Sequence, residues 1–194
     1  MVMTEMTFHT ETVSLKRSKF PIIDELYTDV DLQNNLSRKC KSIGDEQERK
    51  TNVKADMTNW FMHETDKDFE TIANKAIKLA HDNNPLPVRV EMSTYDCWGA
   101  VYKRGDWTKS HDHWPYIWSW VYNVECCANC APLGFNGTTY SLKPKVGRLT
   151  MFPGWIKHFV PAHKCGHDRI IVAGNISEDP HSVILKRNNR VDHK

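Results

Sequence analysis

The order of apolar and polar positions divides the chain into a helical first half and a strand-rich second half. In residues 65–82, apolar side chains recur at three- and four-residue spacing, which predicts an amphipathic helix. Thr65 and Asp68 have the spacing of a capping box at its start, and Asn83, Asn84 and Pro85 end it. The predicted apolar face consists of Phe69, Ile72, Ala73, Ala76 and either Leu79 or Ala80.

A second helix is expected over residues 28–43, because Leu32, Leu36 and Cys40 lie four residues apart. Its start carries residues that favour the N-cap position, namely Thr28, Asp29 and Asp31.

From Pro87 onward the period of the pattern changes to two, the period of a half-buried strand. The segment YIWSWVYNV, residues 116–124, alternates large aromatics with smaller residues, and GRLTMF, HFV and RIIVAGNI are short β-rich runs. Several short strands after two helices predict a mainly β sandwich or barrel with N-terminal helices packed outside. We expect a single domain over residues 1–194, with helical support in 20–85 and the β core in 86–190.

Composition narrows the classes of function. The chain has 194 residues, 40% of them hydrophobic, and a net charge of +2. Without a basic stripe we expect no nucleic-acid partner, and without a run of about 18 apolar residues we expect no membrane span. The polar N-terminal segment lacks the apolar middle of a signal peptide, so we expect a cytoplasmic protein, for example in a bacterial host cell.

The most informative short motif is SHDHW, which places His111 and His113 two residues apart. On a strand these imidazoles would point to the same side, and two histidines of one strand need a third metal ligand from a neighbouring strand. His158 follows the next Pro-Gly turn and is the candidate. The plain alternative is a pair of solvated histidines, and Asp112 is the reserve ligand if the strand twists.

Arg169 opens the last strong strand, RIIVAGNI, eleven residues after His158. A fixed guanidinium beside a three-ligand metal can hold an acidic co-substrate by paired hydrogen bonds. A facial site with open positions is typical of non-haem Fe(II) enzymes, in which the third ligand is usually a carboxylate.

Four stretches together resemble one family: FPIIDELY, KRGDWTKSHDHWPYIWSWVYNV, GRLTMFPGWIKHFVPAH and DRIIVAGN. They resemble the 2-oxoglutarate/Fe(II)-dependent oxygenases, specifically the small enzymes related to prolyl 4-hydroxylases that occur in marine bacteria and phages. The resemblance implies a double-stranded β-helix, or jelly roll. It also implies iron ligands at His111, His113 and His158, and a salt bridge from Arg169 to the distal carboxylate of 2-oxoglutarate.

The same resemblance implies a dioxygenase that hydroxylates an unactivated C–H bond and releases succinate and CO2. Its cofactors would be Fe(II) and 2-oxoglutarate, with ascorbate as reductant, and its partners O2 and a peptide or small-molecule substrate such as a prolyl side chain. Two alternatives stay open: a three-His cupin-like dioxygenase without 2-oxoglutarate, and a non-enzymatic jelly-roll binding module stabilised by zinc.

Two departures from the family pattern concern the site. The usual carboxylate ligand is replaced by His113, so we expect metal release as the pH falls toward about 6, near the free imidazole pKa of ~6.5. The serine that often follows the arginine is replaced by Ile171. Tyr122 is then a candidate to supply a hydroxyl to 2-oxoglutarate, and Asn175 is either a pocket contact or a strand-end polar group.

Cysteines and further histidines form a second group of candidates. Cys126, Cys127 and Cys130 lie in the segment CCANC, which we expect to be a plain loop with free, non-catalytic thiols. Cys165 and His167 are the residues that could complete a zinc site there. We expect His163 and His167 to be solvated.

Overall fold

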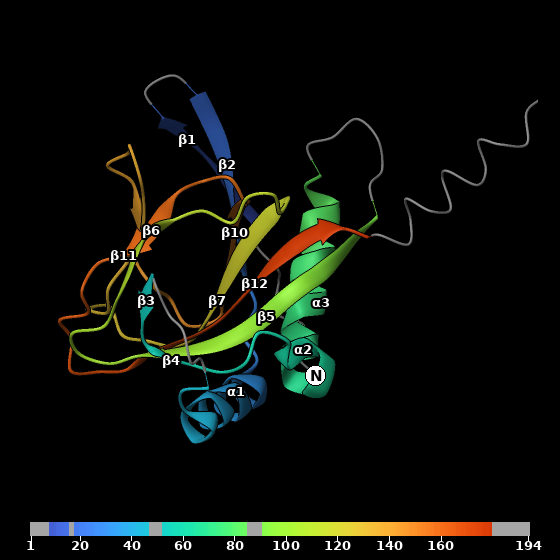
Figure 1. The fold of residues 1–194 in the computed structure, drawn as a ribbon. Helices are drawn as coiled ribbons and strands as arrows, with labels where there is room; N and C mark the ends of the chain where they lie inside the picture. Colours follow the sequence, from blue (N-terminus) through green and yellow to red (C-terminus); the bar gives the residue numbers. More distant parts are fainter. Residues whose placement is uncertain (1–7, 16–17, 47–51, 85–90, 180–194) are drawn as a thin grey trace, which may run out of the picture.

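Two facing antiparallel sheets form a jelly roll with helices on one outer face, as Figure 1 shows and as the sequence predicts. The protein is described by a computed structural model in residues 8–15, 18–46, 52–84 and 91–179. The larger sheet has seven strands in the order β1 (Phe8–Leu15), β2 (Ser18–Leu26), β10 (Arg148–Pro153), β7 (Trp118–Glu125), β12 (Arg169–Glu178), β5 (Met92–Tyr102) and β4 (Asp56–Met57). The smaller sheet has five, in the order β3 (Val53–Lys54), β6 (Trp107–His111), β11 (His158–Val160), β8 (Leu133–Phe135) and β9 (Ser141–Leu142).

The helices α1 (Val30–Ile43), α2 (Met62–Thr65) and α3 (Lys67–Asp82) contact the seven-stranded sheet. Two cores result. One lies between the helices and that sheet, where Leu36 and Ile72 meet Trp118 and Val172. The other lies between the two sheets and includes Phe20, Tyr102, Val121, Phe152 and Ile171. The helical core therefore supports the sheet from behind, while the second core surrounds the space between the sheets.

The helix starts differ in part from expectation. Asp29 is the N-cap of α1, and its carboxylate accepts a hydrogen bond from the amide of Leu32 at 3.0 Å. Helix α3 is capped by Asp66, which accepts from the amides of Asp68 and Phe69. Thr65 ends α2 instead, so the predicted capping box between Thr65 and Asp68 is wrong. Because α2 includes Thr65, the N-cap of α3 is the next residue, Asp66. The apolar spacing within α3 does not contain this information.

The first half of the chain is less helical than predicted. The segment from Phe20 to Leu26 belongs to β2, which pairs with β10 in the register Ile23↔Met151. Short strands β3 and β4 lie between the helices in sequence and join opposite sheets. These strands are stabilised by partners far along the chain, and local periodicity does not report such partners. No helix within the described ranges is long and apolar enough to cross a membrane.

Candidate metal and co-substrate site

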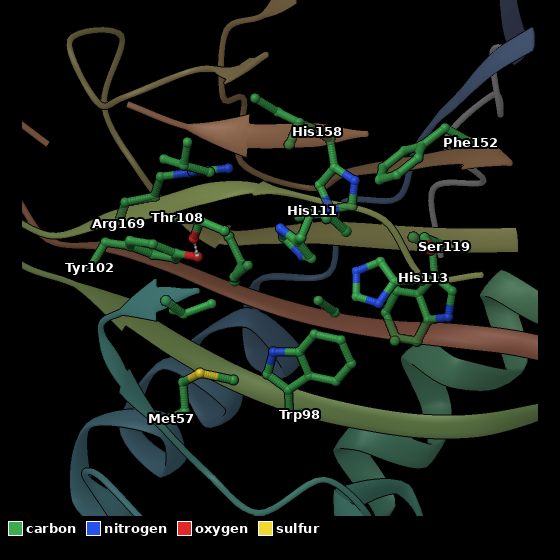
Figure 2. Close-up of a pocket in the computed structure, with 18 residues that line it drawn as sticks. Met57, Trp98, Tyr102, Thr108, His111, His113, Ser119, Phe152, His158 and Arg169 are labelled. Atoms are coloured by element: carbon green, nitrogen blue, oxygen red, sulfur yellow. Dashed lines mark hydrogen bonds between the residues drawn. The ribbon is translucent and has the colours of Figure 1, made fainter. Parts of the chain in front are cut away.

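A pocket opens between the two sheets, and Figure 2 shows three histidines at one end of it and Arg169 at the other. The walls are mainly apolar, with a small number of polar groups that point inward, as is usual for small-molecule sites. The residues that line it include Met57, Trp98, Tyr102, Thr108, His111, His113, Ser119, Val121, Phe152, His158, Arg169, Ile171 and Ala173.

The three predicted metal ligands come together. His111 ends β6 and His158 begins β11, and the two are direct partners in the ladder between these strands. The ring of His111 lies 4.4 Å from that of His158 and 4.8 Å from that of His113, centroid to centroid. One nitrogen from each ring lies within 4.8 Å of the other two, so the three imidazoles can share one metal ion.

His113 joins this cluster from a turn and not from a strand, which the sequence did not indicate. It lies two residues beyond the end of β6, so the picture of one strand carrying both histidines on one face is wrong. Its amide donates a hydrogen bond to the carbonyl oxygen of Gly154 at 2.7 Å, which fixes the turn. The carboxylate of Asp112, the reserve ligand, accepts from the amide of Trp114 at 3.3 Å and is not part of the cluster.

Backbone carbonyl groups orient two of the rings. The Nδ1 atom of His111 lies 2.8 Å from the carbonyl oxygen of Lys109, and that of His158 lies 3.0 Å from the carbonyl oxygen of Ile156. A ring nitrogen must carry a proton to bond a carbonyl, so Nε2 of each ring keeps its lone pair for a metal.

Burial keeps the three rings neutral, which is the form that binds a metal. Desolvation lowers the pKa of His111, lowers that of His113 to about 3, and lowers that of His158 well below its usual value. Each ring would also repel a proton on its neighbours, and this repulsion lowers the pKa of His113 and His158 further.

Arg169 is a buried cation with unused donors. Its side chain is only 2% exposed, and its guanidinium carbon lies 5.5 Å from the ring centroid of Tyr102. The Nε and Nη1 atoms have no hydrogen-bond partner in the parts of the chain that the structure describes. Burial lowers the pKa of Arg169, and an unpaired buried charge costs several kcal/mol. A carboxylate that enters the pocket would remove this cost, so the donor set fits an acidic co-substrate.

The hydroxyl groups that line the pocket near Arg169 do not include that of Tyr122, which the sequence suggested. The hydroxyl of Tyr122 donates to the carbonyl oxygen of Tyr27 and accepts from the side-chain Nε2 of Gln33, on the helical side of the sheet. Tyr122 is therefore not positioned to contact a ligand in the pocket. Tyr102 and Thr108 line the pocket instead, with their hydroxyl oxygens 2.8 Å apart. Tyr102 is the ladder partner of Arg169, a pairing between β5 and β12 that sequence reasoning missed.

Asn175 supports the histidine cluster from behind. Its side-chain nitrogen lies 3.3 Å from Nδ1 of His113 and donates to the carboxylate of Asp96 at 2.9 Å. Its side-chain oxygen accepts from the hydroxyl of Ser119 at 2.8 Å. The sequence left Asn175 as a pocket contact or a strand-end polar group. In the structure it lies within β12 and beside His113, and it is not one of the residues that line the pocket. Desolvation raises the pKa of the buried Asp96 to about 6.

A second cluster lies away from the pocket. All six cysteines are free thiols, yet the fold brings Cys127, Cys130 and Cys165 together. His167 is exposed as expected, whereas His163 is only 1% exposed, so its predicted solvation is wrong. Its ring bonds the amide of Ala131 and the carbonyl of His167, which is why a loop histidine can be buried.

Solved structures with the same fold are numerous. A prolyl-4-hydroxylase from Pseudomonas putida is 16% identical, with a TM-score of 0.63 over 81% of this chain and 92% of that one. The viral collagen prolyl hydroxylase of Paramecium Bursaria Chlorella virus-1, solved with 2-oxoglutarate, is 16% identical, with a TM-score of 0.61 over 77% and 91%. The α-ketoglutarate-dependent epimerase SnoN is 8% identical, with a TM-score of 0.63 over 81% and 78%.

At these identities the likeness establishes a shared fold alone, the jelly roll. No protein-family model and no curated protein sequence matches the chain.

Proposed function

We propose that this protein is a 2-oxoglutarate- and Fe(II)-dependent oxygenase. His111, His113 and His158 would hold the iron, and Arg169 would pair with the distal carboxylate of 2-oxoglutarate. The observation that carries the proposal is the buried guanidinium with unused donors in the same pocket as three neutral imidazoles. A three-His dioxygenase without 2-oxoglutarate, or a zinc-stabilised binding module, leaves that buried charge without a partner.

Each protein group has a defined task in this proposal. The bound iron would supply the oxidative chemistry, in which O2 decarboxylates 2-oxoglutarate to succinate and CO2 and hydroxylates a substrate C–H bond. Arg169 orients the diacid toward the histidines, and the ring of Tyr102 lies against the guanidinium. Apolar wall residues such as Val121 and Ile171 exclude water, which strengthens the interaction between Arg169 and a carboxylate.

The substrate class that we propose is a peptide side chain, with prolyl residues as the first candidates. Two of the fold relatives are prolyl hydroxylases by name. Aromatic side chains are also exposed at the surface: Trp114, which follows His113 in the sequence, is 73% exposed, and Tyr95 is 52% exposed. The ring of Tyr95 packs against that of Tyr116 with centroids 4.8 Å apart and a tilt of 39°. Such surfaces suit proline-containing peptides, which dock on aromatic side chains in other recognition domains.

The primary test is calorimetric titration of 2-oxoglutarate into Mn(II)-loaded protein without oxygen. Each charge-assisted hydrogen bond to a carboxylate contributes roughly 1.5–3 kcal/mol, so Arg169→Leu should weaken binding by tens- to hundreds-fold. Arg169→Lys should fall between, because an ammonium cannot reproduce the paired geometry. The exposed Arg104 provides a matched control, and Arg104→Leu should bind like wild type.

Absence of 2-oxoglutarate binding by wild-type protein, or equal binding by wild type and Arg169→Leu, would remove the co-substrate from this proposal. Succinate release with Fe(II), 2-oxoglutarate and ascorbate, measured with and without prolyl peptides, then tests the substrate class. Succinate formation that no prolyl peptide stimulates, but another peptide does, would reject the prolyl assignment and keep the oxygenase.

A further inference from the structure

The thiol cluster joins two loops, one between β7 and β8 and the other between β11 and β12. Cys127 and Cys130 lie in the loop that follows β7, where the amide of Cys130 donates to the carbonyl oxygen of Cys127 at 3.1 Å. Cys165 and His167 lie in the loop between β11 and β12. These four residues come from segments about 35–40 positions apart, so their meeting is a product of the fold.

The sulfur atoms have the spacing of a metal-thiolate site. The Sγ atom of Cys127 lies 3.7 Å from that of Cys130 and 3.4 Å from that of Cys165. A tetrahedron with Zn–S bonds of about 2.3 Å has edges of about 3.8 Å. A ring nitrogen of His167 and the sulfurs of Cys127 and Cys130 all lie within 4.8 Å of one another, which makes His167 the candidate for the fourth ligand.

Hydrogen bonds assign different tasks to the two nearby histidines. Nδ1 of His167 lies 2.7 Å from the carbonyl oxygen of Asp168 and therefore carries the proton, which leaves the lone pair on Nε2. A carboxylate oxygen of Glu125 lies 4.0 Å from this Nε2 atom, beyond hydrogen-bond distance. His163 has no free nitrogen, because Nδ1 accepts from the amide of Ala131 at 3.2 Å and Nε2 donates to the carbonyl oxygen of His167 at 2.7 Å. His167 is thus the available ligand, and His163 ties the loops together.

Backbone amides also point at the sulfurs. The amide of Cys127 donates to Sγ of Cys130 and the amide of His167 donates to Sγ of Cys165, each at 3.3 Å. Such bonds favour thiolates. The amide of Asn129 and the thiol of Cys165 lower the pKa of Cys127 to about 7. Burial raises the pKa of Cys130 to about 12, a barrier that direct coordination to a metal overcomes.

We propose that Cys127, Cys130, Cys165 and His167 form a structural zinc site. Three thiolates and one imidazole are the soft donor set that selects zinc, and four protein ligands leave no position open for chemistry. The site is distinct from the histidine cluster in the pocket, which has three protein ligands. Cys165 and His167 lie in the loop immediately before Arg169, the first residue of β12. A metal bound there would therefore fix the position of the residue that carries the guanidinium.

The first test is the zinc content of protein purified under reducing conditions without chelators. We expect about one zinc per chain, retained in His158→Ala, because the pocket histidines are not its ligands. Cys127→Ser and Cys165→Ser should each lose it. Cys126→Ser is the matched control: it changes the adjacent thiol, which is outside the ligand cluster, and should retain the zinc.

A second test uses wild-type protein alone and so does not depend on how a variant folds. Exchange with Co(II) should produce the visible absorption of a tetrahedral cobalt-thiolate centre, and a mercurial that blocks thiols should release the metal. Protein without zinc in which Cys127, Cys130 and Cys165 react freely with a thiol reagent would overturn the proposal, as would a Cys127–Cys130 or Cys127–Cys165 disulfide found in the purified protein. Zinc that is lost from His158→Ala but kept in Cys165→Ser would also overturn it. None of these readouts depends on 2-oxoglutarate.

Discussion

At the scale of single residues, the unusual feature of the proposed iron site is an imidazole in the position where non-haem Fe(II) sites usually have a carboxylate. A neutral third ligand leaves the metal centre one unit more positive and makes its occupancy depend on proton competition. The structure changes how this competition is expected to proceed, because burial lowers the pKa of His111, His113 and His158. The expectation of metal release near pH 6, which assumed free imidazoles, therefore moves to lower pH.

We predict that Mn(II) stays bound at pH 6 and is released only below it. A ligand whose pKa is lowered stays neutral over a wider range of acidity, so protons compete with the metal later than they do for a free imidazole. Titration of Mn(II) binding by electron paramagnetic resonance at pH 7, 6 and 5 measures this. A release midpoint at or above about pH 6.5, the pKa of free imidazole, would contradict it.

The buried carboxylate of Asp96 provides a second pH-dependent prediction. Its folded-state pKa of about 6 is above the ordinary 3.8, so its contribution to stability is complete below about pH 4 and declines as the pH rises through 6. One pKa unit corresponds to about 1.4 kcal/mol, so Asp96→Asn should gain up to about 3 kcal/mol relative to wild type between pH 4 and pH 7.

The measurement is urea unfolding of metal-free wild type and Asp96→Asn at several pH values, and the difference between them is the readout. The histidine cluster acts in the opposite direction in both proteins and cancels in this difference. Asp31→Asn, at an exposed position, should show no such trend. A difference that stays constant from pH 4 to pH 7 would mean that Asp96 is not penalised by burial.

At the scale of elements, the helices were predictable because their information is local. The apolar faces of α1 and α3 follow from spacing alone, and Leu36, Phe69 and Ile72 are all fully buried. The strand β2 was missed although it forms a hairpin with β1. The strands β3 and β4 were missed because each has only two residues and pairs with a strand distant in sequence. The same reason explains Tyr102 and Asp96, whose roles arise from pairing between β5 and β12.

The cap of α3 provides a prediction at this scale. Asp66 accepts two amide hydrogen bonds and an ion pair from Lys39, so Asp66→Ala should lower the free energy of unfolding by about 1–2 kcal/mol. Asp68→Ala removes only the second ion pair of Lys39 and should cost less than about 1 kcal/mol. Chemical denaturation checks both. Equal losses would place the stabilising role in the ion pairs instead of the cap.

At the scale of the whole molecule, the two cores have different roles. The core under the helices stabilises the seven-stranded sheet, and the core between the sheets surrounds the pocket. The three candidate metal-binding histidines and Arg169 could be selected from the order of the motifs along the chain, although His113 lies beyond the end of the strand that was predicted to carry it. Three features were not predictable, because they depend on how distant segments pack: the position of His113 beyond β6, the contact of Asn175 with His113, and the cysteine cluster outside the pocket.

Because the pocket exists only in the folded chain, a metal bound there should stabilise the whole protein. At a free Mn(II) concentration 100 times the dissociation constant, the gain is about 2.7 kcal/mol. Thermal unfolding should show this gain for wild type and lose it for His158→Ala. His81→Ala, at the end of α3, should keep it. Equal stabilisation of wild type and His158→Ala would place the metal elsewhere.

Strand β12 fixes the distance between Arg169 and the histidine cluster, so the pocket should select a ligand by its length. Arg169 begins this strand and Asn175, which supports His113, lies further along it, while β5 and β7 hold the strand on both sides. Neither end can shift independently, because a change of register by one residue would turn every side chain to the opposite face. A keto-diacid one carbon shorter or longer than 2-oxoglutarate should therefore compete poorly in the same calorimetric titration, even though it offers identical functional groups.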